Sequence, residues 1–196
     1  NDGGVYKTNN GGLNWTDCSS GLIISQMYRM DIAQQDTKII TGLQDNGTKL
    51  RQTSGNWTDR IGGDGMDCHI SPDNSNVMYA SWQFGNFYRS TNGSDFSAMG
   101  VPDGGTGGWI TPLAIDPSNT QNVYIGYNRI QKSTNQGETW TTVSEEINAD
   151  HNLTYLAVAP SNGNILYTGA HWIPVYRSDD GGVTWTKFTH WHGGTE

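Results

Sequence analysis

The feature that most constrains this chain is a short string that recurs and ends in an aromatic residue. TNNGGLNW (8–15), STNQGETW (133–140) and SDDGGVTW (178–185) share a Ser or Thr, an Asn or Asp two residues later, a glycine and a final Trp. STNGSDF (90–96) is one residue shorter, and TSGNW (53–57) keeps only part of the pattern. The closing aromatics are separated by 42, 39, 44 and 45 residues, and they are Trp15, Trp57, Phe96, Trp140 and Trp185. Such a period predicts a series of similar units.

The residues before each of these strings, which we call boxes, repeat as well. An alternating apolar run, a turn of Pro, Asn or Asp, and a second run with small residues occupy 30–44, 68–82, 113–127 and 156–170. A third short run precedes each box and a fourth follows it. Four strands in a period of about 43 residues are typical of a β-propeller blade. Helical folds are excluded, because no window keeps apolar residues at helical spacing and 26 of 196 residues are glycine.

The repeat predicts an all-β chain, organised as an arc of four-stranded antiparallel blades with the boxes at the turns between third and fourth strands. One segment, 1–196, would hold a half-blade at 1–22 followed by four full blades. We place these blades at about 23–61, 62–107, 108–150 and 151–190. The last residues are too few to complete the half-blade, so we expect the arc to be continuous with further blades or domains of a larger propeller.

Charge and cysteine content exclude several classes of function. Lys and Arg number 11 against 19 Asp and Glu, which gives a net charge of −8 and disfavours nucleic acid as a partner. No apolar run approaches the roughly 18 residues of a membrane-spanning helix, so no membrane insertion is expected. The strand order places Cys18 and Cys68 in different blades, so we expect two unpaired, buried thiols.

The boxes are interpreted as structural. Their third residues, Asn10, Asn92, Asn135 and Asp180, are suited to accept hydrogen bonds from their own turn. The glycines Gly12, Gly137 and Gly182 suit a positive φ, and the aromatics Trp15, Trp140 and Trp185 are expected to pack between sheets. Three of these four third residues are Asn, which keeps the acceptor without the charge. A catalytic acid would not tolerate that exchange, whereas a turn does.

These strings resemble the Asp-box (BNR) repeat, S-x-D-x-G-x-T-W, of sialidases, sortilin-type receptors and xyloglucan-degrading glycoside hydrolases. Within that group, GLQDNGT (42–48) and GGDGMDCHISP (62–72) are similar to segments of large secreted bacterial proteins, sortilin-like or xyloglucanase-like. The resemblance implies a propeller fold and a location outside the cell or on its surface. It does not choose a function, because such repeats occur in hydrolases, lectin-like proteins and receptors alike.

Candidate binding residues gather in the loops opposite the boxes. In a propeller blade, the loop from second to third strand and the crossover to the next blade lie at one edge. Aromatic faces beside amide and carboxylate groups suit sugars, whose C–H faces stack while their hydroxyls donate and accept. The alternative is that QDNG and GGDG are only tight turns and that the tryptophans pack between blades. The candidates are Gln44, Asp45, Asn46, Asp64, Trp82, Trp109 and Trp172.

Catalysis has weaker support in the sequence. A glycosidase needs two carboxylates about 5–5.5 Å or about 6.5–9.5 Å apart, and no pattern identifies such a pair. We therefore expect a module that binds a polysaccharide or a protein surface. A xyloglucanase-like glycoside hydrolase and a structural scaffold or adhesin remain as alternatives. The histidines show no metal-ligand spacing, no cofactor is expected, and the loops of Asp, Asn and Gly leave calcium open. The weak catalytic candidates are Asp45, Asp64, Asp67 and Asp103.

Overall fold

A computed structural model describes residues 4–21, 25–101, 107–147, 151–171 and 174–188. These residues form four four-stranded antiparallel sheets and one two-stranded hairpin, with a single 3-10 turn at Gln83–Gly85. The prediction of an all-β chain built as an arc of propeller blades is thereby confirmed. In the described ranges no helix is long and apolar enough to cross a membrane.

Each sheet follows the order of the chain, so that every strand pairs with the next one. The hairpin comprises β1 (Tyr6–Lys7) and β2 (Thr16–Asp17). The first sheet comprises β3 (Met27–Ile32), β4 (Ile39–Leu43), β5 (Gly47–Arg51) and β6 (Trp57–Ile61). The second comprises β7 (Cys68–Ile70), β8 (Met78–Trp82), β9 (Asn86–Ser90) and β10 (Ser97–Ala98). The third comprises β11 (Leu113–Ile115), β12 (Val123–Gly126), β13 (Ile130–Ser133) and β14 (Thr141–Thr142). The fourth comprises β15 (Tyr155–Ala159), β16 (Asn162–Gly169), β17 (Tyr176–Ser178) and β18 (Thr186–Lys187).

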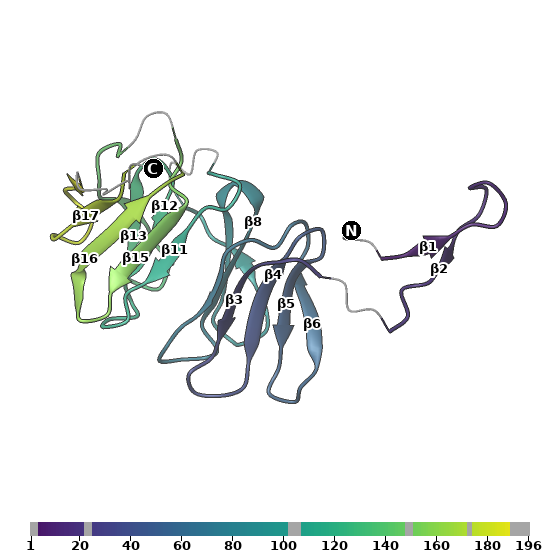
Figure 1. Ribbon diagram of the computed structural model, residues 1–196. Helices are drawn as coiled ribbons and strands as arrows, with labels where there is room; N and C mark the ends of the chain where they lie inside the picture. The colour runs from purple at the N-terminus through teal and green to yellow at the C-terminus, as the bar shows by residue number, and fades with distance from the viewer. Residues whose placement is uncertain (1–3, 22–24, 102–106, 148–150, 172–173, 189–196) are drawn as a thin grey trace, which may run out of the picture.

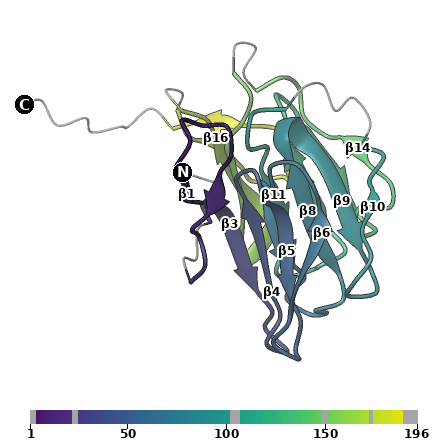
Figure 2. The ribbon, with the colours of Figure 1, turned by 90° about the vertical axis from the view of Figure 1, so that its right-hand side faces the viewer.

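The core lies between successive sheets. Ile40 and Leu50 of the first sheet, both fully buried, pack against Met78 of the second, and equivalent clusters join the second sheet to the third and the third to the fourth. The inner strands β3, β7, β11 and β15 lie beside one another in that order. The sheets therefore form an arc around the inner strands, while the β1–β2 hairpin lies to one side of them (Figure 1, Figure 2).

Loops separate into two edges that we call the box edge and the mouth edge. At the box edge, the turn between third and fourth strands donates to the turn between first and second strands of the same sheet. Examples are Gly93 N–H to Asn76 O and Gln136 N–H to Gln121 O, both 2.9 Å. At the mouth edge, the crossovers bond to the loops between second and third strands, as in Gly107 N–H to Phe84 O at 3.1 Å. The hydrogen bonds thus place turn chemistry and candidate binding loops at opposite ends of the sheets.

In the boxes, the third side chain accepts main-chain N–H groups of its own turn. Asn135 Oδ1 accepts the Thr139 N–H at 2.9 Å, and Asn10, Asn92 and Asp180 accept equivalent bonds. Gly12, Gly137 and Gly182 have φ of 94°, 84° and 94°, in the left-handed region that glycine adopts without a Cβ penalty.

The box aromatics do not all pack between sheets, which corrects the sequence expectation. Trp140 is 9% exposed and packs in the core cluster of the second sheet, and Trp185 packs on the third. Both rings thus lie in core clusters that join their own sheet to the preceding one. Trp57 and Trp15 are 51% and 61% exposed, because among the described residues no sheet precedes the first and the hairpin stands apart.

Both cysteines are unpaired, as predicted. Cys68 is buried on β7, and burial raises the pKa of its thiol. Cys18 is exposed, so the expectation of two buried thiols was wrong for this residue. The reason is its position just after β2, in the hairpin that lies away from the sheets.

Candidate functional site

Two mouth loops that the sequence singled out, QDNG (44–47) and GGDG (62–65), lie against each other. Asp64 Oδ1 accepts the Asp45 N–H at 2.7 Å, and Gly47 N–H donates to Gly63 O at 2.9 Å. A Cβ added to Gly65 would lie 2.2 Å from Gly47 O, so this approach requires glycine. Asp45 is exposed with φ of 55°, in the left-handed region that Asp tolerates better than most residues. The Asp64 carboxylate therefore joins the two loops.

Trp82, Gln83 and Phe84 form the neighbouring mouth loop on the second sheet. The Gln83 Oε1 accepts the Asp64 N–H at 3.3 Å, which ties this loop to the first. Trp82 is partly buried and makes an edge contact with Tyr88, with ring centroids 5.5 Å apart. Its packing role is evident, whereas Phe84 has φ of 65° and a side chain that is 44% exposed. The exposed aromatic of this loop is thus Phe84, which the sequence did not single out.

Trp109 completes an exposed aromatic pair with Phe84, which we call the mouth pair. The ring centroids are 5.3 Å apart in an edge-to-face arrangement, and Trp109 is 46% exposed. The indole Nε1–H of Trp109 donates to the Tyr28 hydroxyl at 3.3 Å. Tyr28 lies on β3, so Trp109 reaches from the crossover after the second sheet back to the first. The pair is therefore held in place by groups from separate sheets.

Asp67, one of the weak catalytic candidates, lies in the interior rather than among the exposed acids of the mouth. The residue is 5% exposed, because it immediately precedes β7 and its side chain lies between sheets. Its Oδ2 accepts the Leu113 N–H of the third sheet at 2.7 Å, and its own N–H donates to Ser81 Oγ at 3.1 Å. Asp67 is thus a buried link between blades.

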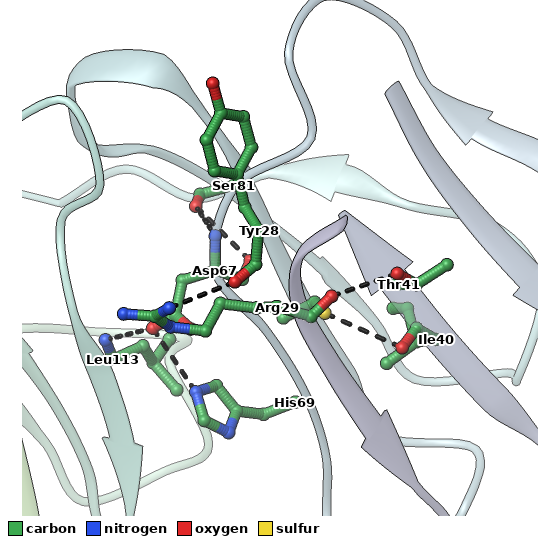
Figure 3. A network of polar contacts seen from close by, with 9 residues as sticks. Tyr28, Arg29, Ile40, Thr41, Asp67, His69, Ser81 and Leu113 are labelled. Carbon is green, nitrogen blue, oxygen red and sulfur yellow. Dashed lines mark hydrogen bonds and ion pairs between the residues drawn. The ribbon is translucent and has the colours of Figure 1, made fainter. Parts of the chain in front are cut away.

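Two cationic side chains approach the same carboxylate (Figure 3). Arg29 Nε lies 3.9 Å from Asp67 Oδ1, and His69 Nε2 lies 3.3 Å from Asp67 Oδ2. Burial opposes protonation of His69, but the charge and hydrogen bond of Asp67 outweigh it and raise the pKa of the imidazole. The side chains of Arg29 and His69 remain 49% and 31% exposed. A polar cluster with an exposed outer side therefore lies next to Tyr28 and the mouth pair.

The remaining predicted site residues are Gln44, Asn46, Asp103 and Trp172. Gln44 and Asn46 flank Asp45 in its loop, and the Asn46 side chain donates to Gln44 O at 2.9 Å. Asp103 and Trp172 lie outside the described residues. In the part of the chain that the structure describes, no three His, Cys, Asp or Glu side chains are grouped as metal ligands.

Sequence reasoning missed Phe84, Tyr28, Arg29 and His69. Their one available signal was position, since Phe84 lies in a predicted mouth loop and the others lie on or beside predicted inner strands. Their meeting depends on crossovers between sheets, which neither spacing nor composition specifies.

Comparison with known proteins finds similarity to glycoside hydrolases. No family model matches the chain. A curated xyloglucanase of Hypocrea jecorina (strain QM6a) is 30% identical over 140 residues, which is 59% of this chain and 16% of that protein. An ancestral GH74 enzyme of known structure superposes with a TM-score of 0.68 at 20% identity, over 95% of this chain and 28% of its own. The GH74 xyloglucanase from Xanthomonas campestris gives 0.63 at 14% identity, over 88% and 31%.

These likenesses concern the fold of the chain and part of its sequence. The two structures show a shared propeller fold, and the curated relative makes the similarity one to glycoside hydrolases. The chain spans less than a third of the length of each of these proteins. Activity and substrate therefore have to be argued from the site itself.

Proposed function

We propose that this chain is part of an extracellular Asp-box propeller that binds a polysaccharide along its mouth edge, with xyloglucan as the first ligand to test. The observation that supports this most is the mouth pair, Phe84 and Trp109, both more than two-fifths exposed and both fixed by neighbouring sheets. A rigid aromatic surface loses little conformational entropy when a sugar stacks on it. The similarity to a xyloglucanase supports the choice of ligand.

Polar groups beside the mouth pair suit hydroxyl recognition. Asp64 and Gln83 are tied together at 3.3 Å, and Gln83 immediately precedes Phe84. Gln44 and Asn46 add amides to the adjoining loop, and amides both donate and accept hydrogen bonds. The net charge of −8 disfavours nucleic acid as the ligand.

The test is binding of soluble xyloglucan by isothermal titration calorimetry. Trp109→Ala should weaken binding about fivefold, because one lost stacking contact is worth about 1 kcal/mol. Trp57→Ala is the matched control: that Trp is 51% exposed but lies at the end of the first sheet, away from the mouth edge. Unchanged binding in Trp109→Ala, with the fold intact, would remove the support for this surface. No binding by the parent protein would favour the scaffold alternative.

A second candidate function is hydrolysis of the same polysaccharide, supported by the 30% identity to a xyloglucanase. Asp45 and Asp64 are the carboxylates of the mouth loops that remain candidates after Asp67 is placed in the interior. Asp64→Asn keeps an acceptor for the Asp45 N–H, so the loop should persist. Release of reducing ends by the parent protein, lost in Asp64→Asn while binding persists, would support catalysis. Absence of release by the parent protein would leave the binding function alone.

A further inference from the structure

A β-bulge on the inner strand of the first sheet aims two side chains into the mouth. Met27 pairs with Leu43 and Arg29 pairs with Gly42, so Tyr28 is an extra residue opposite this step of β4. A bulge bends its strand and redirects the side chains around it. The Tyr28 hydroxyl accepts the Trp109 indole N–H. Arg29 extends across Asp67 (Figure 3). The bulge therefore connects a guanidinium to the aromatic surface through Tyr28, whose carbonyl accepts from Arg29 and whose hydroxyl accepts from Trp109.

Arg29 contacts the Tyr28 carbonyl and the Asp67 carboxylate, and its remaining N–H donors are available to a ligand. Its Nη1 donates to Tyr28 O at 3.0 Å, and its Nε lies 3.9 Å from Asp67 Oδ1. A guanidinium carries five N–H donors, so these two contacts with described residues leave several unused. The side chain is 49% exposed. An oriented, half-exposed guanidinium with unused donors is a binding group for a planar anion such as a carboxylate.

The carboxylates that face this group already accept protein donors. Asp67 Oδ2 accepts the Leu113 N–H at 2.7 Å and lies 3.3 Å from His69 Nε2. Asp31, on the same strand as Arg29, accepts the Ile70 N–H and the Ile32 N–H, each at 2.8 Å. When His69 is protonated, Arg29 and His69 balance the charges of Asp31 and Asp67. An added anion at Arg29 then meets a locally neutral cluster rather than a negative one.

We propose that Arg29 makes the mouth edge select polysaccharides that carry carboxylate groups. The sugar ring lies on the mouth pair and its carboxylate accepts hydrogen bonds from the Arg29 guanidinium. This rests on the proposed glycan-binding function and adds a substrate class to it. The exposed ring of Trp109 and the guanidinium are linked through Tyr28, whose hydroxyl accepts from Trp109 and whose carbonyl accepts from Arg29.

Charge on His69 should tune this selectivity. Because Asp67 raises the pKa of His69, the imidazole gains its proton at a higher pH than an isolated histidine does. Binding of a carboxylate should therefore strengthen as pH falls through the His69 titration, until the ligand itself is protonated near pH 4. Binding of a neutral ligand should not follow this dependence.

The experiment compares two probes that differ only in charge. One is a β-1,4-glucan oligosaccharide, and the other is the same oligosaccharide with part of its C6 hydroxymethyl groups oxidised to carboxylates. The parent protein should bind the oxidised probe about tenfold more tightly at low salt, as expected for a charge-assisted bidentate contact. Arg29→Gln should abolish that preference and leave affinity for the neutral probe unchanged. His69→Gln should flatten the pH dependence of the preference.

Arg129→Gln is the matched control. Arg129 also forms a 3.9 Å ion pair, with Glu145, and its side chain is 42% exposed. It lies in the mouth loop of the third sheet, just before β13, so it carries a similar charge at the same edge on another sheet, and its loss should leave the preference intact. Arg29→Lys keeps the charge without the planar fork and should give an intermediate preference, which also serves if Arg29→Gln fails to fold.

Each outcome separates this proposal from the broader one. Equal binding of both probes, or a preference that survives Arg29→Gln, would overturn the role of Arg29 and leave glycan binding standing. Failure of the parent protein to bind either probe would overturn both. Equal losses in Arg29→Gln and Arg129→Gln would show a general charge effect and would also overturn the proposal.

Discussion

Two boxes with the same turn but different surroundings show what the repeat itself determines. In the third sheet, Ser133 Oγ accepts the Gly137 N–H at 2.7 Å. In the hairpin, Thr8 Oγ1 accepts the Gly12 N–H at 3.0 Å. The final Trp140 is 9% exposed, whereas Trp15 is 61% exposed. The turn therefore forms from its own residues, and burial of the aromatic is a separate event.

Burial depends on the sheet that comes before. Trp140, Trp185 and Phe96 each pack in a core cluster that joins their own sheet to the one before it. Trp57 is 51% exposed on the one full sheet that no other described sheet precedes. A box whose aromatic is buried in this way thus combines a local turn, the fastener, with an aromatic anchor between two sheets. In the third sheet the turn also contacts the second sheet, since the Tyr79 hydroxyl and Arg89 Nη1 donate to Gln136 O at 3.0 and 2.8 Å.

The largest expected effect tests the anchor. Trp140→Ala should lower the free energy of unfolding by about 3–5 kcal/mol, because it leaves a cavity between the second and third sheets. Trp15→Ala should change it by less than about 0.5 kcal/mol, because the side chain is exposed. Urea denaturation followed by tryptophan fluorescence and circular dichroism measures both. Similar losses in the two variants would break the distinction between anchor and fastener.

A smaller effect tests the fastener. Ser133→Ala should cost about 1–3 kcal/mol, because the Ser133 hydroxyl is 1% exposed and its loss leaves the Gly137 N–H buried without an acceptor. Thr8→Ala removes an equivalent hydrogen bond from a turn that water reaches, so it should cost less than about 1 kcal/mol.

The same denaturation series, with Thr8→Val as a shape control, measures the two costs. Equal costs for Ser133→Ala and Thr8→Ala would show that the fastener does not depend on its surroundings.

The fold was accessible from sequence because its signals are local and repeated. The spacing of the box aromatics and the paired strand runs identified the four-stranded units. The third short runs predicted before the boxes occur, for example, as β9 (Asn86–Ser90) and β13 (Ile130–Ser133). Each of these depends on neighbours along the chain, where alternation and turn chemistry apply.

The site was accessible only in part, because it depends on contacts between sheets. The loops at Asp45 and Asp64 could be placed at one edge, since blade geometry puts them there. The burial of Asp67 depends on the Leu113 N–H of the next sheet, 46 residues away. The contact of Trp109 with Tyr28 joins residues 81 positions apart in the chain. It also depends on a β-bulge at Tyr28 that no residue pattern predicts. Contacts between residues this far apart produce no periodic pattern in the sequence.

The smallest expected effect distinguishes the charged box from the uncharged ones. A hydrogen bond from the Thr184 hydroxyl, joined by the Thr184 N–H, lowers the pKa of Asp180 from 3.8 to about 2. Because the folded pKa is depressed, this stabilisation is present above pH 3.8 and is lost as pH falls towards about 2. Asp180 is exposed, so solvent screening keeps the effect below about 1 kcal/mol.

Asp180→Asn should therefore leave the free energy of unfolding at pH 7 within about 1 kcal/mol of the parent and should reduce its decline between pH 4 and about 2. Asn135 shows that an amide fits this position, since its Oδ1 accepts the Thr139 N–H and its Nδ2 donates to the Thr139 hydroxyl, both at 2.9 Å. The reciprocal variant, Asn135→Asp, should acquire the acid dependence that Asp180→Asn loses. Thermal denaturation across this pH range measures the difference. If neither exchange alters the acid dependence, the charge on the box carboxylate contributes nothing to the fastener, and the turn is held by a side-chain oxygen that accepts equally well without charge.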